Sequence, residues 1–322
     1  MLIVVLVMGK CRVCGRKAEY WVPWANSWFC REHFIEYVER GVRKTFEKYV
    51  PRSHHRILFA VSGGKDSLTV LHALAPYLLE KGYEVGVLFI DLGIGEYSRR
   101  AKSIVEENTR VLGIPLIVAD LSSYGFTITD VAELVMRRVL RRPVCSICGM
   151  VKRYLMNRVA YEKGYDLVVT GHNLDDTLSF ILHNIMGGNM EAAIKLKPYV
   201  PGRDGLVAKA RPLIYTYEVE TQWYVEAKKI SYLMEKCPYT PRKESIVMRL
   251  KHYLREIDKS SPGYMKMALR NIIDRLLPRI TIKEEGKLVR CSICGMPAST
   301  DPCGFCRTRE RILEYLGRKN TG

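Results

Sequence analysis

The sequence is short of amide side chains and of negative charge. Glutamine occurs once, at Gln222, and lysine and arginine number 51 against 34 aspartates and glutamates. Few thermolabile amides beside many charged residues favour a thermophilic source. The net charge is +17, which is typical of proteins that bind a polyanion, most often a nucleic acid. A basic but merely solvated surface is the alternative interpretation.

Long apolar runs are missing as well. The apolar start, Met1 to Met8, is too short to cross a membrane and has neither the charged lead nor the cleavage site of a signal peptide. We interpret it as a strand-like or disordered extension and expect a cytoplasmic protein with no membrane partner. Apolar residues still make up 48% of 322 residues, which is enough for one large α/β domain with small appendages.

Ten cysteines are present, and they fall into three sets along the chain. In a reducing compartment such spacings indicate metal binding or catalysis, not disulfides. The first and last sets each offer four ligands in two close pairs, as a closed tetrahedral zinc site requires. We therefore predict two structural Zn²⁺ sites, which supply folding free energy to segments with little core. Their ligands are Cys11, Cys14, Cys30 and His33 in the first set, and Cys291, Cys294, Cys303 and Cys306 in the last.

The middle set, Cys145, Cys148 and Cys237, is one ligand short of a closed tetrahedral site. Three interpretations remain open at this point. One thiol could carry sulfur as a persulfide that another resolves. The three could instead hold an iron–sulfur cluster with one open iron, or they could be buried structural thiols.

An apolar run, Ile57–Val61, leads directly into the hexapeptide Ser62-Gly63-Gly64-Lys65-Asp66-Ser67, and an apolar helical pattern follows. A short apolar run bounded by glycines predicts a buried parallel strand, so the unit is strand, tight loop and helix. The two glycines permit close backbone approach, and free N–H groups at the start of the helix attract an anion. The serines add donors and Lys65 adds positive charge. The spacing is not that of a Walker A loop.

The rest of the chain alternates between strand and helix patterns. This alternation predicts a doubly wound parallel sheet, an α/β fold whose ligands bind at the carboxyl ends of the strands. Ile90 and Asp91 should therefore lie near a nucleotide. Asp175 and Asp176 follow a later strand, where they could hold Mg²⁺ or cap the next helix. We expect strands at about 85–91, 114–121, 166–170 and 209–213, and helices at about 97–112, 129–142, 145–163, 217–235, 243–257 and 263–277.

Basic residues gather in two helical regions, at 34–56 and beyond 243, which are our candidates for an RNA surface. A separate feature is the spacing of Cys148 and Lys152. They are four residues apart and share one face of the helix that begins near Cys145. A cation beside a thiolate or a phosphate assists catalysis, whereas an ordinary surface lysine is the alternative.

The hexapeptide resembles the PP-loop of the ATP pyrophosphatases, which adenylate a carbonyl oxygen, release pyrophosphate and let a nucleophile displace AMP. The ordered combination of motifs is more specific. It resembles the TtuA class of tRNA 2-thiouridine synthetases over residues 11 to about 316. In chain order, the combination consists of the first zinc set, the loop Ser62–Ser67, the pair Cys145 and Cys148, the segment Gly171-His172-Asn173-Leu174-Asp175-Asp176, then Cys237 and the last zinc set.

This resemblance implies a division of the chain and a set of site residues. It implies a zinc finger at 1–34, a PP-loop catalytic domain at 35–235, a helical extension at 236–286, and a zinc finger with a tail helix at 287–322. Cys145, Cys148 and Cys237 would hold a [4Fe–4S] cluster, and Lys152 and Asp176 match catalytic positions. The implied ATP-binding residues are Ala60, Ser62, Gly63, Gly64, Lys65, Asp66, Ser67, Ile90, Lys152, Gly171 and Asp176.

The resemblance also implies a reaction and its partners. ATP with Mg²⁺ adenylates the C2 oxygen of a tRNA uridine, and sulfide bound to the cluster replaces it to give 2-thiouridine. A ubiquitin-like carrier with a C-terminal thiocarboxylate supplies the sulfur, and the assembly is a homodimer. A T-loop uridine is favoured and the wobble uridine is the alternative. Competing hypotheses are persulfide-based thiolation, a non-catalytic zinc-ribbon RNA-binding protein, and an amide-forming synthetase.

Overall fold

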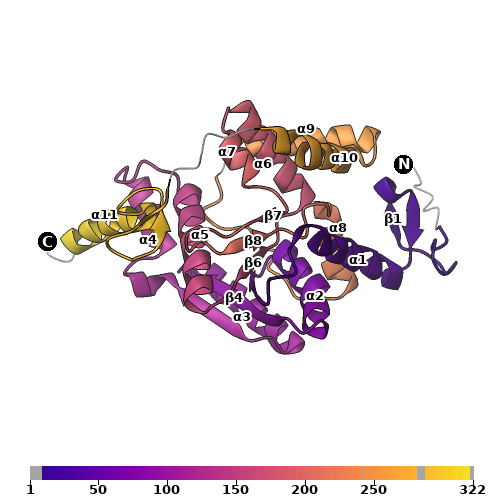
Figure 1. Ribbon diagram of the computed structural model, residues 1–322, viewed down its shortest axis with the longest axis horizontal. Coiled ribbons are helices and arrows are strands. Elements are labelled where there is room, and N and C mark those ends of the chain that lie inside the picture. Colours follow the sequence, from indigo (N-terminus) through magenta and orange to yellow (C-terminus); the bar gives the residue numbers. More distant parts are fainter. Residues whose placement is uncertain (1–8, 242, 281–286, 320–322) are drawn as a thin grey trace.

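The computed structural model describes residues 9–241, 243–280 and 287–319 (Figure 1). The N-terminal extension Met1–Met8, for which we expected a strand or disorder, lies outside these residues. Within the described ranges, no helix has both the length and the apolar character needed to cross a bilayer.

A six-stranded sheet in the order β5-β4-β3-β6-β8-β7 forms the centre of the protein. The first five strands in this order are parallel, and β7 runs antiparallel to β8 at one edge. The predicted doubly wound sheet is confirmed, with one antiparallel edge strand that the sequence did not indicate. The strands are β3 (Arg56–Ala60), β4 (Glu84–Asp91), β5 (Leu116–Asp120), β6 (Leu167–Thr170), β7 (Tyr199–Val200) and β8 (Ala208–Ala210).

The chain runs outward from β3 to β5 and then returns to β6 on the other side of β3. The strand order therefore reverses between β3 and β6, and ligands of such sheets bind at the carboxyl ends of the strands beside this point. Ala60 at the end of β3 pairs in register with Leu88 of β4 and Thr170 of β6. The loops that follow β3 and β6 are therefore neighbours.

Helices cover both faces of the sheet. One face packs against α1 (Arg31–Tyr49), α2 (Lys65–Glu80), α3 (Gly95–Leu112) and α8 (Glu218–Ala227) in the largest core cluster. The other face packs against α5 (Val144–Glu162), beside which lies α4 (Ile128–Met136). Alternate strand residues serve the two faces. Phe59 and Val169 face the first group of helices, and Leu58 and Val168 face α5.

A further group of helices packs together around a core of its own (Figure 1). It contains α6 (Leu174–Met186), α7 (Met190–Ile194), α9 (Ile246–Ser260) and α10 (Tyr264–Asn271), which continues into a π turn at Ile272–Leu276 and a 3₁₀ turn at Leu277–Arg279. Since α6 begins directly after β6, this group stands next to the ligand edge of the sheet.

Two small modules lie at opposite ends of the molecule (Figure 1). The N-terminal one is a hairpin of β1 (Tyr20–Val22) and β2 (Ser27–Phe29) joined by a 3₁₀ turn at Pro23–Ala25. The C-terminal one pairs β9 (Val289–Arg290) with β10 (Pro297–Ala298) and continues into α11 (Gly304–Lys319). Another 3₁₀ turn, Leu121–Tyr124, follows β5.

Several predicted helices are longer than the observed ones. The helix expected at 129–142 ends at Met136, because Arg138 has a φ of 59° and the amides of Val139 and Leu140 both turn back to Leu134 O. The one expected at 217–235 ends at Ala227 and is followed by Lys229 with a φ of 55°. The basic region at 34–56 is helical only as far as Tyr49, just before Pro51.

Candidate functional site

The loop after β3 has the shape that the sequence predicted. Gly63 has a φ of 82°, a conformation that L residues with side chains rarely adopt, and Gly64 precedes the first turn of α2. The Ser67 hydroxyl accepts from the Ser62 amide across 3.2 Å and donates to the Gly64 carbonyl across 2.9 Å. These contacts keep the loop tight at a helix N-terminus, where free amide groups favour an anion.

Gly171, at the end of β6, lies directly against this loop. A Cβ atom at this position would stand 2.7 Å from backbone atoms of Asp66 and from the Cα of Ser67. Only glycine permits this approach without a shift of the backbone. Ala60 and Ile90 are both half-buried near the carboxyl ends of β3 and β4. The predicted ATP-binding residues therefore gather on one edge of the sheet, and Lys152 belongs to α5, which packs on the same strands.

A network of carboxylates and cations lies in front of the loop. Lys65 Nζ lies 3.0 Å from an oxygen of Asp66 and 3.1 Å from one of Glu218. The Thr221 hydroxyl donates to Asp66 across 2.6 Å, and the Glu218 amide donates to Asp175 across 2.8 Å. The start of α8 is thereby joined to the loop and to the start of α6.

Helix α9 adds two cations to the same network. Lys251 donates to Asp176 across 2.7 Å and also contacts Glu218, and Arg255 donates to Asp175 across 2.6 Å and also contacts Glu218. Lys251 is only 7% exposed. The sequence predicts that both residues belong to a candidate RNA surface. The structure corrects this, because both side chains point inward to the acids beside the PP-loop.

Electrostatics within the network favour the charged forms of Glu218 and Lys65 but not that of Asp66. Burial raises the pKa of Glu218, but hydrogen bonding and charge from Lys251 and then Lys65 outweigh it and bring the pKa to about 2. Burial lowers the pKa of Lys65, yet the nearby Asp66 and Glu218 raise it above its ordinary value. The pKa of Asp66 is raised, because its burial outweighs the influence of Lys65.

The predicted caps at the start of α6 need correction. The side chain that caps this helix is Asn173, which accepts from the Asp176 amide across 2.9 Å. Asp175 instead holds the Glu218 amide and Arg255, while Asp176 is half-exposed and faces Lys251. Of the two acids, Asp176 is the one that a divalent cation could reach.

The three middle cysteines meet beside this edge. Cys145 and Cys148 lie in the first turns of α5, and the Cys145 thiol approaches the Tyr239 carbonyl at 3.7 Å, two residues beyond Cys237. Burial raises the pKa of Cys148, nearby Lys152 lowers it, and Cys237 and Cys145 raise it further. Cys145 is exposed and the other two thiols are partly so. The predicted proximity of Cys148 and Lys152 is therefore observed.

The thiols of this centre do not converge as they would on one metal ion. Among the described residues, the groups of three or more ligand side chains whose atoms all lie within 4.8 Å of one another are the two terminal sets. A set of three thiols leaves one position of a four-iron cluster open.

Both terminal sets have the geometry of closed tetrahedral sites. In the first, His33 Nδ1 lies 3.2 Å from Cys30 Sγ and 3.5 Å from Cys11 Sγ. In the last, Cys294 and Cys303 have their sulfurs 3.9 Å apart. Two sulfurs bound to one Zn²⁺ at the usual bond length are separated by about 3.8 Å. The ligand sets predicted from the sequence are brought together, and their chemistry fits zinc.

The aromatic residues of the N-terminal module contact both the ligand set and the rest of the protein. Trp28 does pack beside the metal ligands. Tyr20 instead stacks on Phe34 with ring centres 4.4 Å apart, and Trp24 stacks on Tyr217 at 3.7 Å and donates to buried Glu220. These rings join the module to α1 and to the start of α8.

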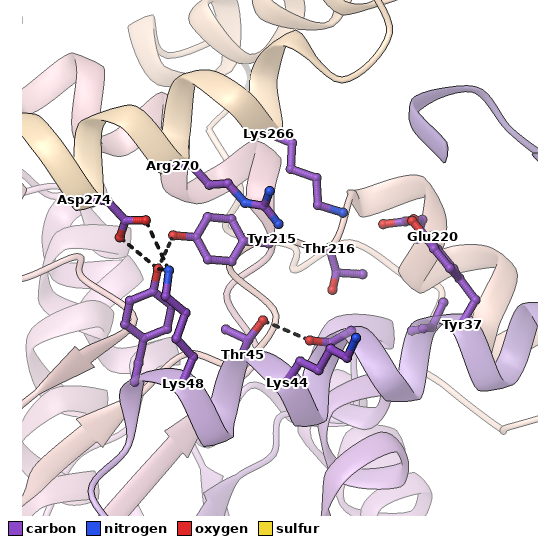
Figure 2. Close-up of a pocket in the computed structure, with 13 residues that line it drawn as sticks. Tyr37, Lys44, Thr45, Lys48, Tyr215, Thr216, Glu220, Lys266, Arg270 and Asp274 are labelled. Carbon is purple, nitrogen blue, oxygen red and sulfur yellow. Dashed lines mark hydrogen bonds and ion pairs between the residues drawn. The ribbon is translucent and has the colours of Figure 1, made fainter. Parts of the chain in front are cut away.

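A cavity of about 360 Å³ lies between α1 and α10 (Figure 2). It brings the two basic regions predicted from the sequence face to face, and Figure 2 shows Lys266 extending from α10 into the space above α1. Lys48 is paired with Asp274 across 3.1 Å, whereas no ion pair of Lys44 or Lys266 is found in the described ranges. The lining includes Tyr37, Lys44, Thr45, Lys48, Tyr49, Tyr215, Thr216, Glu220, Lys266, Arg270 and Asp274.

Glu218, Thr221, Lys251 and Arg255 are site residues that the sequence did not reveal. Lys251 and Arg255 are four residues apart in a helix with many other cations, and nothing in that pattern separates an inward face from an outward one. Glu218 lies in the first turn of α8, where an acid is expected for reasons of helix polarity alone.

Comparisons with known proteins agree with this geometry. A profile of the PP-loop domain family matches residues 36–251, and one of the 2-thiouridine synthetase TtuA N-terminal LIM domain matches residues 10–35. The chain is 37% identical over 304 residues to the tRNA-5-methyluridine(54) 2-sulfurtransferase of Pyrococcus horikoshii, covering 92% of this chain and 93% of that one. It is 38% identical over 318 residues to the protein of the same name from Thermotoga maritima, covering 97% and 98%.

A solved structure shows the same architecture. The U34-tRNA thiolase NcsA from Methanococcus maripaludis with its [4Fe-4S] cluster superposes with a TM-score of 0.75 at 27% identity, covering 95% of this chain and 97% of that one. The profile match spans more than half of the chain, and two relatives exceed 30% identity over nearly its whole length. The chain therefore belongs to the PP-loop tRNA 2-thiouridine synthetase family, in the TtuA class.

Proposed function

We propose that this protein is an ATP-dependent tRNA uridine 2-sulfurtransferase, which converts 5-methyluridine 54 of the tRNA T-loop to its 2-thio form. The observation that carries the proposal is the position of two centres on one edge of the sheet. The PP-loop and its acids lie at the switch point between β3 and β6, and the three-cysteine centre lies at the start of α5, which packs on the same sheet.

The uridine C2 carbonyl explains why both centres are needed. It is a poor electrophile without a leaving group. Attack of its oxygen on the α-phosphorus of ATP releases pyrophosphate and creates an adenylated oxygen. Hydrosulfide then attacks C2, the C2–O bond breaks, AMP leaves with the former carbonyl oxygen, and one proton is released. The PP-loop amides, Lys65 and Mg²⁺ would stabilise the charge of the departing pyrophosphate.

Asp176 is the residue that we assign to Mg²⁺, because its carboxylate is partly exposed beside the loop. In the structure, Lys251 neutralises this acid. Arrival of Mg²⁺ with ATP would release Lys251 from Asp176 toward a phosphate oxygen. Lys152 follows Cys148 by one helical turn, where its charge can favour a thiolate or the adenylated intermediate.

Cys145, Cys148 and Cys237 would hold a [4Fe–4S] cluster, which would supply an iron site for the sulfide that replaces the oxygen. Their partial exposure fits a group that must meet a substrate, and the NcsA thiolase that superposes on this chain was solved with such a cluster. Persulfide transfer through the same three thiols is the second candidate mechanism.

The cleft between α1 and α10 is our proposed contact surface for RNA. Lys44 and Lys266 face it without an ion-pair partner in the described part of the chain, beside rings on which bases can stack. Loss of both lysines should weaken tRNA binding, and the salt dependence of binding should become shallower. Lys163→Ala, which removes an exposed lysine at the far end of α5, is the matched control.

The remaining parts of the proposal concern partners and the target position. A ubiquitin-like thiocarboxylate carrier would deliver sulfur to a cytoplasmic homodimer. Position 54 is favoured by the names of the two relatives above, and the wobble position 34 is the second candidate because the superposing NcsA is a U34-tRNA thiolase.

The experiment that tests this function combines anaerobically reconstituted protein with tRNA, ATP, Mg²⁺ and sulfide. Nucleosides from the digested tRNA are identified by mass spectrometry, and tRNAs lacking a uridine at 54 or at 34 give the position. We expect thiolation that needs ATP and is lost without uridine 54. If thiolation were lost only in the tRNA without uridine 34, the wobble position would be the target. Absence of any 2-thiouridine would refute the function.

A further inference from the structure

Arg211, directly after β8, is a buried cation without a full set of partners. It is 9% exposed, and its Nη1 donates to the Lys197 carbonyl across 2.8 Å. Its Nε has no hydrogen-bond partner, and no carboxylate pairs with Arg211 in the ranges that the structure describes. Leaving a buried guanidinium N–H unsatisfied is costly, so such a group signals a ligand that completes it.

Lys209, two residues earlier, points to the same face of the sheet. Its neighbours Ala208 and Ala210 pack on the opposite face, so alternation along the strand directs Lys209 toward α5. Burial lowers the pKa of Lys209 to about 8, and the nearby charges of Arg211, Arg153 and Lys195 act in the same direction. Within the described residues, the neighbouring charges that act on the pKa of Lys209 are therefore all positive.

Arg153 reaches the group from α5, and we call Arg153, Lys209 and Arg211 the β8 basic cluster. His172, beside it at the end of β6, adds no charge at neutral pH. Its Nδ1 lies 2.9 Å from the Thr170 hydroxyl, and burial followed by the charge of Arg211 lowers its pKa to about 4, although the charge of Asp176 acts in the opposite direction. In the ranges that the structure describes, no ion pair joins an acid to Arg153, Lys209 or Arg211, so these cations repel one another, and an anion between them would remove that repulsion.

The β8 basic cluster is separate from the phosphate cradle of the PP-loop. In the sheet, β8 stands two places from β3, about 10 Å away at the usual strand spacing. It is also close to the sulfur-transfer centre, because Arg153 follows Cys148 by five residues, about 7.5 Å along the axis of α5.

From this arrangement we propose that the β8 basic cluster binds a backbone phosphate of the RNA strand next to the target nucleotide. The inference rests on the proposed function. A base modified at C2 must leave its stack to reach an enclosed site, and the phosphates on either side of it must then be held close to the catalytic groups. The phosphates of ATP already have a binding loop at the start of α2. We therefore expect the β8 basic cluster to bind the other polyanion of the reaction, the tRNA.

The test measures two affinities for each variant, one for an unmodified tRNA and one for the Mg²⁺ complex of α,β-methylene ATP. The variants are Lys209→Met and Arg153→Ala, singly and together, with Lys163→Ala as the control of equal charge change. Arg211→Lys is added because it keeps the charge but cannot reproduce the fork of donors. Loss of one charge at Lys209 or Arg153 should weaken tRNA binding about tenfold near physiological salt, reduce the salt slope by about 0.9, and leave nucleotide affinity unchanged. Arg211→Lys should weaken tRNA binding without changing the salt slope or the nucleotide affinity.

Other outcomes overturn the proposal in distinct ways. Weaker nucleotide binding with unchanged tRNA binding would assign the cluster to ATP. Unchanged affinities for both would show that it is not an anion site. If wild-type protein thiolates tRNA while these variants bind tRNA normally, only the phosphate site fails. If the wild type neither binds nor thiolates tRNA, the proposed function itself fails.

Discussion

Lys251 Nζ of α9 lies 2.7 Å from a carboxylate oxygen of Asp176 of α6. The lysine is almost fully buried and the acid is partly exposed. This pair closes the charge network beside the PP-loop in the state described here, and it connects the helical group around α9 to the chemistry at the sheet edge.

Replacement of Lys251 by methionine should expose this relationship. Asp176 and Glu218 would lose their buried cation, and stability should fall by about 2 kcal/mol, since half of the pair is partly solvated. Because Asp176 is freed while Glu218 keeps its contacts with Lys65 and Arg255, Mg²⁺ should raise the melting temperature of the variant more than that of the wild type. Thermal unfolding with and without Mg²⁺ measures this, and an equal rise in both proteins would contradict the assignment of Asp176.

Glu218 should make stability depend on acid pH. Its pKa falls from an ordinary 4.5 to about 2 in the folded protein. A carboxylate whose pKa is lowered by folding stabilises the folded protein fully above pH 4.5. This contribution is lost as the pH falls toward 2. Glu218→Gln should therefore be less stable than the wild type by about 2 kcal/mol at pH 6.

Denaturant unfolding at pH 6 and pH 3 tests this, and the gap between the two proteins should narrow at pH 3. Glu226→Gln, an exposed acid on the same helix, is the control and should show no comparable gap. Loss of zinc at low pH affects both proteins alike. If the difference in free energy of unfolding between the two proteins were the same at pH 6 and pH 3, Lys251 and Lys65 would not be lowering the pKa of Glu218.

The C-terminal zinc module should support the cysteine centre through one ring. Phe305 stacks on Tyr154 of α5 with ring centres 3.8 Å apart, and it belongs to the core cluster that includes Ile147 and Leu155. Phe305→Ala should cost about 3 kcal/mol and lower the iron retained after anaerobic reconstitution. Tyr161→Ala, which removes an exposed ring from α5, should retain iron normally. Equal iron in both variants would refute the support role.

The two terminal ligand sets should each hold one zinc ion. Elemental analysis of the wild type should give about two zinc ions per chain, since each set closes a tetrahedron. Cys14→Ser and Cys294→Ser should each reduce this to about one. Retention of two ions by either variant would remove that set from the zinc sites.

Because of Lys209, the affinity for tRNA should fall at alkaline pH. Its pKa is lowered to about 8 by burial and then by Arg211, Arg153 and Lys195, so a rise from pH 7 to pH 9 removes its charge. Affinity for tRNA should fall over this range in the wild type but stay flat in Lys209→Arg, whose guanidinium remains charged. The same fall in both proteins would place the titrating group elsewhere.

The sequence predicted those parts of the structure that depend on local patterns. The apolar strands, the glycine loop and the paired cysteines each carry a spacing that admits few structures, and the sheet and both ligand sets were found where expected. The ends of helices were less predictable. Nothing in the local sequence indicates that Arg138 and Lys229 take a positive φ.

The charge network is the part of the site that sequence reasoning missed. Lys251 meets Asp176, although 75 residues separate them in the sequence, and Arg255 meets Asp175 across 80. Such pairs arise from the packing of α9 on α6, and a lysine in an amphipathic basic helix has no local mark that distinguishes an inward from an outward position. Arg211 was missed for the same reason, because nothing in its local sequence marks it as buried.

The central claim is that ATP activates the C2 oxygen of the uridine. The most direct test uses tRNA whose target uridine carries ¹⁸O at C2, with reconstituted protein, ATP and sulfide, followed by mass spectrometry of the released AMP. The account predicts one ¹⁸O in the phosphate of AMP for every 2-thiouridine formed. Thiolation with unlabelled AMP, and with the label released into water or inorganic phosphate, would contradict it.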